Sequence, residues 1–262
     1  MQGHIFFEGS PWPEGHAVKE MELSANLSEN GVSLNLHLGT EDYYLARDID
    51  VEDEDGEPLP EYEDLPAWQH PSVWYNYHAC TISNTFWSSG PSPIMLSKPG
   101  EPFSLKDLSG RVFKIDPVPK LEDGRADPEF HWEHDDLHFH TYLLGHDAVA
   151  DHEISFKQTK DGLFDIDWSG RVAMAYVGDY DFRYKFRAQL KEVPFLGFAC
   201  ARLEGENVSD HIYPEPELRR KTQTQWAEKW LADVDELNYL VREERGWRDL
   251  FSPRDKWVKF WV

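Results

Sequence analysis

The sequence has no long apolar run, and its first residues do not resemble a secretion signal. No stretch approaches the ~18 apolar residues that span a bilayer, and residues 1–8 show neither the charged start nor the apolar centre of a secretion signal. We therefore predict a cytoplasmic protein without membrane partners. Cysteine is scarce as well, with two residues in 262. We expect Cys80 and Cys200 to be reduced, buried thiols rather than a disulfide.

Basic residues are few compared with acidic ones. The chain has 26 Lys and Arg against 49 Asp and Glu, and a formal net charge of −23. Because affinity for phosphate rises with the number of cations, this balance argues against nucleic acid as a partner. A basic protein or a cationic ligand stays open, as does the simpler interpretation of an acidic, soluble surface.

Several signatures of common enzymes are missing. The sequence contains no Gly-x-Ser-x-Gly, phosphate loop, dinucleotide glycine motif, His-Glu-x-x-His or Cys-x-x-Cys. The acidic run at residues 52–57 fails as a calcium hand, because Gly56 in the sixth place would put Val51 at the first ligand position. A solvated loop is the better interpretation of this run.

The clearest pattern that is present is an alternation of period two in the second half of the chain. Side chains of a strand point to opposite faces in turn, so this pattern predicts a strand with an aromatic inner face and a cationic outer face. The inner residues are Tyr180, Phe182, Tyr184, Phe186, Ala188 and Leu190, and the outer ones are Asp181, Arg183, Lys185, Arg187 and Gln189.

Two further stretches predict hairpins. Apolar residues alternate on both sides of Asn30-Gly31 over residues 21–38. Around Gly162, the apolar residues of both strands share one face only if Gly162 adopts a left-handed backbone. This register pairs Phe156 with Ile166. Additional strands are expected at 42–51, 73–83 and 171–177, whereas the proline-rich and glycine-rich residues 116–128 resemble a linker.

These patterns predict a mainly β protein: an antiparallel sandwich or two fused barrel-like β halves, with one long C-terminal helix. The helix is expected over 217–245, where apolar residues recur at spacings of three and four, ahead of a basic, aromatic tail at 247–262. We divide the chain into an N-terminal β half at 1–118, a β meander half at 119–213, and the helix with its tail at 214–262.

A cluster of histidines is the best lead to chemistry. Six of the twelve histidines lie between 131 and 152, and His138 and His140 are two apart, so they would share one face of a strand. With His131 and His134 nearby, the cluster could hold a divalent transition metal. The alternative is a plain polar strand face and loop.

Tryptophan and the cationic stripe suggest a second kind of site. Trp132 and Trp168 could stack on a sugar or an aromatic ligand, although both are equally suited to the core or its rim. Arg183, Lys185 and Arg187 could hold an anion. Cross-strand acids such as Asp165 and Asp167 could neutralise them instead.

On balance the sequence favours a non-catalytic binding or interaction protein. Its ligand would be an apolar or aromatic small molecule, or its partner a basic protein. The alternative is a metal-dependent or glycan-acting enzyme that uses the histidines at 131–140. This alternative lacks a nucleophile with a base, or a complete set of metal ligands, that spacing alone could assign.

Overall fold

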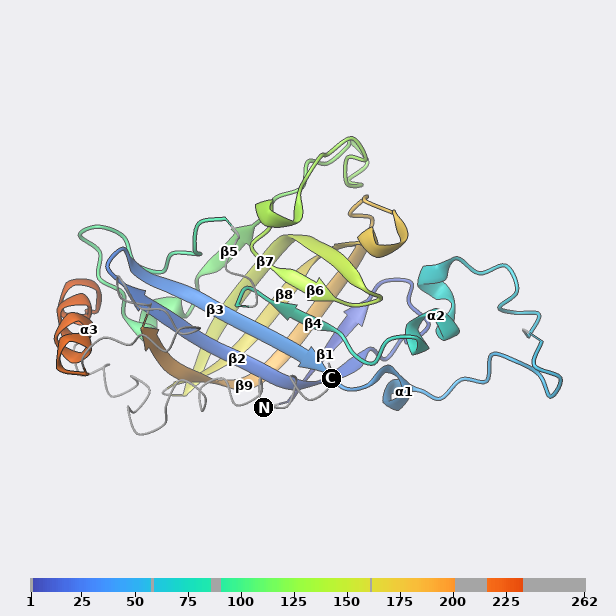
Figure 1. Ribbon diagram of the computed structural model, residues 1–262, viewed down its shortest axis with the longest axis horizontal. Helices are drawn as coiled ribbons and strands as arrows, with labels where there is room; N and C mark the ends of the chain where they lie inside the picture. The colour runs from blue at the N-terminus through green and yellow to red at the C-terminus, as the bar shows by residue number, and fades with distance from the viewer. Residues whose placement is uncertain (1, 58, 86–90, 161, 201–215, 233–262) are drawn as a thin grey trace. The chain divides into compact units, whose positions relative to one another are not determined.

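The computed structural model describes residues 2–57, 59–85, 91–160, 162–200 and 216–232 (Figure 1). Nine strands dominate it: β1 (Gln2–Phe7), β2 (His16–Ser28), β3 (Gly31–Thr40), β4 (Thr81–Ser83), β5 (Val112–Ile115), β6 (His140–Tyr142), β7 (His146–Lys160), β8 (Leu163–Ala173) and β9 (Tyr184–Cys200). The helices are α1 (Tyr43–Ala46), α2 (Pro71–Tyr75) and α3 (Pro216–Trp230), with 3₁₀ turns η1 (Ala67–Gln69), η2 (Leu105–Leu108), η3 (His134–Asp136) and η4 (Ala175–Val177). The predicted mainly antiparallel β class is confirmed.

The strands form one sheet that closes on itself. Their order is β5-β7-β6-β4-β3-β2-β1-β9-β8, and β7 pairs with β8 as well. β5 and β6 pair with different parts of β7, at residues 152–155 and 146–148 respectively. Closing the ring gives the long strands partners on both edges, which removes the exposed edges that promote aggregation.

The hairpin of β7 and β8 has the predicted register. Phe156 lies opposite Ile166 and Lys157 opposite Asp165, and Gly162 has the expected left-handed backbone with φ 68°. Keeping the apolar residues of both strands on one face requires one extra residue near the turn. A register shift between Gln158 and Lys160 accommodates it. The need to bury one face of each strand therefore determined this pairing.

By its contacts the chain divides into two compact units. The first contains residues 1–23, 35–94 and 106–195, and the second residues 24–34, 95–105 and 196–262. In the second unit, α3 ends at an isolated parallel bridge between Phe103 and Leu231, and the indole nitrogen of Trp230 donates to the Glu29 carbonyl at 3.1 Å. The predicted boundaries after 118 and 213 stay predictions.

Two strands predicted in the N-terminal half are wrong. Residues 42–51 instead contain the short helix α1, where the Asp42 side chain accepts from the Tyr44 amide. Residues 73–83 contain the end of α2 and then β4, and Trp74 is fully buried. Pro71 at the start of α2 and the His70 side chain, which accepts from the Ser72 amide, favour a helix start over a strand.

The predicted strand at 180–190 begins later than expected. β9 starts at Tyr184, and it continues to Cys200. Phe186, Ala188 and Leu190 are buried as predicted, but Tyr180 is 61% exposed and lies in a loop before the strand. Of the predicted strand at 171–177, the first part belongs to β8 and the last part to η4.

In place of the long C-terminal helix predicted over 217–245, the described residues contain the shorter helix α3 at Pro216–Trp230. Leu231 and Ala232, which the prediction included, are no longer helical, and residues 233–245 and the basic aromatic tail lie outside the described residues. Among the helices that the structure describes, none is long and apolar enough to cross a membrane. Cys80 is a free, buried thiol as predicted, whereas the side chain of Cys200 is outside the described part.

Candidate functional site

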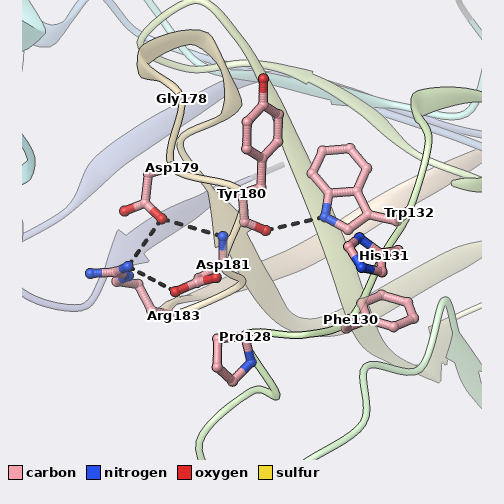
Figure 2. Close-up of a pocket in the computed structure, with 9 residues that line it drawn as sticks. All are labelled: Pro128, Phe130, His131, Trp132, Gly178, Asp179, Tyr180, Asp181 and Arg183. Atoms are coloured by element: carbon pink, nitrogen blue, oxygen red, sulfur yellow. Dashed lines mark hydrogen bonds and ion pairs between the residues drawn. The ribbon is translucent and has the colours of Figure 1, made fainter.

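A pocket of about 520 Å³ lies between two loops of the first unit (Figure 2). One loop is residues 128–132, which precede η3, and the other is residues 178–183, which connect η4 to β9. An aromatic wall faces a charged one across the pocket. The lining residues are Pro128, Phe130, His131, Trp132, Gly178, Asp179, Tyr180, Asp181 and Arg183.

The aromatic wall is built on a contact between the two loops. The rings of Trp132 and Tyr180 have centroids 6.1 Å apart and planes inclined at 57°. The indole N–H of Trp132 donates to the backbone carbonyl of Tyr180 at 3.1 Å, as Figure 2 shows. Since that bond uses the polar atom of the indole, the faces of the rings are what this wall offers to a ligand.

The charged wall consists of one guanidinium and two carboxylates. Nη2 of Arg183 lies 2.9 Å from Oδ2 of Asp181 and 3.2 Å from Oδ1 of Asp179. Partial burial lowers the pKa of Arg183, but the carboxylates of Asp179 and Asp181 raise it, and the net shift is upward. Arg183 is therefore a fixed cation that two anions already neutralise.

A small apolar cluster supports the aromatic wall from behind. Phe130 and Trp132 pack against it, and the centroids of Trp132 and Phe182 are 5.1 Å apart. The cluster joins the outer side of β7 and β8 to the loop at 116–137, so the supposed linker is in fact anchored by buried side chains. Its members are Val118, Ala126, Leu137, Ala148, Ala150, Ala173 and Phe182.

Arg171 of β8 holds the loops around the pocket together. Its buried guanidinium donates to the carbonyls of Gly124 at 2.9 Å and Phe182 at 3.3 Å, and Nε lies 3.2 Å from Oδ2 of Asp151. Lys120 also contacts this carboxylate oxygen, at 2.9 Å. We call Arg171, Asp151 and Lys120 the arginine clamp.

The clamp depends on an irregularity in β7. The register of β7 against β8 shifts between Ala150 and Glu153, where Asp151 adopts a left-handed φ of 52°. This bulge lets Asp151 face Arg171 while His152 remains buried. Asp116 has a similar φ of 51°, and its carbonyl accepts from the Asp151 amide at 2.7 Å. Two strained aspartates therefore face one another beside the clamp.

Three of the residues predicted for ligand or metal sites meet at the pocket: His131, Trp132 and Arg183. Trp168 does not, because it is fully buried in the core. Lys185 pairs with Glu8 at 3.2 Å and Arg187 with Asp167 at 2.9 Å. Asp167 on β8 and Glu8, which directly follows β1, thus neutralise these two cations, as one of the two interpretations of the cationic stripe expected.

The four histidines of the predicted metal site lie on different elements. His131 lines the pocket, and the ring of His134, in η3, is 5.2 Å from that of Trp132. Nδ1 of His138 is 2.5 Å from Oδ1 of Asp116. His140 begins β6, and burial lowers its pKa. Among the described residues, no three His, Cys, Asp or Glu side chains are placed to hold a metal, so metal binding stays a prediction without geometric support.

The most strongly shifted pKa values belong to buried groups away from the pocket. Burial lowers the pKa of His16 and of His152 to about 4 and raises that of Cys80 to about 12. Neither ring nitrogen of His16 has a hydrogen-bond partner among the described residues, and the same holds for Nε2 of His152. These neutral imidazoles are part of the packed interior.

Sequence reasoning assigned no binding role to six of the nine residues that line the pocket. Phe130, Asp179 and Asp181 were assigned no role, and Tyr180 was placed on the inner face of a strand. The turn residues Gly178-Asp179 were the available signal, because a turn there ends one element and allows the next residues to leave the sheet. The partner loop at 128–132 had no comparable local signal.

Comparison of the chain with protein-family models, with curated proteins and with solved structures gave no match. Arguments about function therefore depend on the geometry of the site.

Proposed function

We propose that this chain is a non-catalytic binding protein and that its small apolar or aromatic ligand occupies the pocket between the loops at 128–132 and 178–183. The observation that carries the proposal is the aromatic corner formed by partly buried Trp132 and exposed Tyr180, which faces a polar wall. Ligand sites in proteins commonly combine apolar surfaces with a few placed polar groups. A basic protein as the partner, and the cytoplasmic location, remain parts of this proposal.

The distribution of titratable groups favours binding over catalysis. Catalytic sites tend to gather groups with strongly shifted pKa values in a cleft. Here such groups, His16, His152 and Cys80, are buried in the interior, and each pocket carboxylate has one oxygen paired with Arg183. The alternative of a metal-dependent or glycan-acting enzyme has weaker support, with His131 as its one histidine in the pocket.

A thermal-shift screen against aromatic metabolites, fatty acids, sugars and metals tests the proposal. We expect an aromatic or apolar compound to raise the melting temperature by about 5 °C at a hundredfold excess over its Kd, since binding to the native state then adds ~2.7 kcal/mol. The Trp132→Ala variant should lose this shift. Trp226→Ala, which removes a partly exposed indole outside the pocket, should keep it.

Three results would count against the proposal. A hit that survives Trp132→Ala places the ligand elsewhere in the protein. A hit that the protein converts to product shows an enzyme. Absence of any Trp132-dependent hit, when the variant melts within a few degrees of the parent protein, removes the pocket as the binding site.

A further inference from the structure

The pocket also carries information about the charge of its ligand. Resting on the proposed function, we propose that the pocket selects an organic cation with an alkylated ammonium head. The head would lie against the faces of Trp132 and Tyr180 and beside the carboxylates of Asp179 and Asp181. Such a head occurs both in free quaternary amines and in the methylated lysine of a basic protein, which are two sources of the same chemistry.

The aromatic corner suits a diffuse cation better than a hydrogen-bonding ligand. The π face of an aromatic ring is negative, and a cation within about 6 Å of its centre is attracted to it. Two rings inclined at 57° form adjacent walls of a cage, and Phe130 lines the same pocket. The indole N–H is already bonded to the Tyr180 carbonyl, so it is not available to donate to a neutral polar ligand.

The charged wall supplies the negative potential. Arg183 balances one of its two carboxylates, so Asp179, Asp181 and Arg183 together carry a net formal charge of −1. Of the four carboxylate oxygens, Oδ1 of Asp179 and Oδ2 of Asp181 contact Arg183. The other oxygen of each accepts no hydrogen bond from the described residues. These two oxygens can therefore face a bound cation.

Other ligand charges fit less well. An anion would have to displace a carboxylate from Arg183, at the cost of leaving that carboxylate unpaired. It would also approach a protein whose formal charge is −23, whereas the same field attracts a cation. A neutral sugar could use the free carboxylate oxygens, but it gains nothing from the net charge of the pocket.

The sharpest test compares two probes of equal shape and different charge. Choline and its neutral isostere 3,3-dimethylbutan-1-ol differ in having nitrogen or carbon at the centre of the trimethylated head. Titrations followed by calorimetry and tryptophan fluorescence should show choline binding about tenfold more tightly, as expected for a partly desolvated cation–π contact. Raising the salt concentration should reduce the difference.

Variants then assign the preference to the pocket. Asp181→Asn keeps the size of the side chain and removes its charge, so it should reduce the choline preference several-fold. Asp165→Asn is the matched control, because Asp165 also pairs with a single cation, Lys191 at 2.9 Å, but lies on β8 and does not line the pocket. It makes the same change in net charge, and we expect it to leave the preference intact.

Binding measurements with peptides distinguish the two sources of the cation. Tighter binding of a trimethyllysine peptide than of choline, with unmodified lysine binding weakly, identifies a basic protein partner. Choline binding as tightly as the peptide identifies a free amine. Either result supports the selection of a cation.

The failure of this inference differs from the failure of the proposed function. Equal binding of choline and its isostere, or Trp132-dependent binding of a neutral sugar in preference to choline, overturns cation selection while leaving a binding pocket in place. If neither these probes nor the thermal-shift screen give any Trp132-dependent binding, both the inference and the proposed function are wrong.

Discussion

Replacing Arg171 with methionine is expected to lower the free energy of unfolding by about 3 kcal/mol or more, since removal of one partner of a buried ion pair typically costs ~3–5 kcal/mol. The side chain of Arg171 is 8% exposed and contacts Asp151, Gly124 and Phe182. Methionine fills much of the volume but leaves two carbonyls without this donor. Urea denaturation at pH 7 measures the loss.

Arg187→Met provides the matched control. Arg187, in the adjacent strand β9, contacts Asp167 at 2.9 Å, but its side chain is 60% exposed. Exposed ion pairs contribute ~0–1 kcal/mol, so this variant should unfold within about 1 kcal/mol of the parent protein. Equal losses in the two variants would contradict the role assigned to the arginine clamp.

A double variant tests whether the loss arises from the Asp151 carboxylate, which keeps Lys120 as a partner when Arg171 is removed. Asp151→Asn removes the charge that Arg171 leaves behind, and asparagine tolerates the left-handed φ of 52° at this position. Because the two residues are in contact, the combined loss should be smaller than the sum of the single losses by about 1 kcal/mol. If the two losses in the free energy of unfolding simply add, the effect of replacing Arg171 arises mainly from its lost hydrogen bonds to the two carbonyls.

The clamp also explains why the pocket was largely invisible in the sequence. Arg171 bonds to Gly124, 47 positions earlier, and to Phe182, 11 positions later. These contacts hold residues 116–128, which are rich in proline and glycine, against the outer side of β7 and β8. Val118 and Ala126 are buried there. Periodicity within a segment reports which of its faces is buried, but not which distant carbonyl an arginine will reach.

Strand pairing could be predicted from the sequence where the local alternation of apolar residues also determined which residues lie opposite one another. The register of Phe156 with Ile166 followed from apolar alternation and a glycine turn. The neutralisation of Arg187 by Asp167 followed from strands placed side by side. The prediction at 73–83 was wrong because aromatic residues are common in strands, and this preference concealed the helix start at Pro71 that buries Trp74.

Acid is expected to destabilise the protein through His16 and His152. Burial lowers the pKa of each from 6.5 to about 4. Between these values the unfolded chain binds more protons than the folded one, so stability falls as the pH falls. The effect begins near pH 6.5 and reaches about 2 kcal/mol for each histidine at pH 5 and about 3 kcal/mol at pH 4, at 1.36 kcal/mol per pH unit.

The surroundings of the two rings explain the size of this effect. His16 packs against Tyr43 at 4.9 Å, Trp12 at 5.4 Å and Trp74 at 5.8 Å between ring centroids. Nδ1 of His152 accepts the indole N–H of Trp168 at 3.1 Å, so its neutral form carries the proton on Nε2. Protonating either ring would place a charge among aromatic side chains.

His16→Phe isolates one of the two contributions. Phenylalanine preserves the aromatic contacts and removes two unpartnered nitrogens, so stability at pH 7 should be equal to or above that of the parent protein. Its loss between pH 7 and 5 should be smaller by about 2 kcal/mol. Asp147, whose pKa burial raises, acts in the opposite direction in both proteins and cancels from the comparison.

His78→Gln is the control for the loss of an imidazole, because the side chain of His78 is 90% exposed. Urea denaturation at pH 7, 5 and 4 should give this variant the same pH dependence as the parent protein. If His16→Phe also keeps the full loss on acidification, His16 is already protonated or solvated in the folded protein. The burial that lowers its pKa would then be wrong, since the loss of solvation outweighs the favourable charge of Glu41.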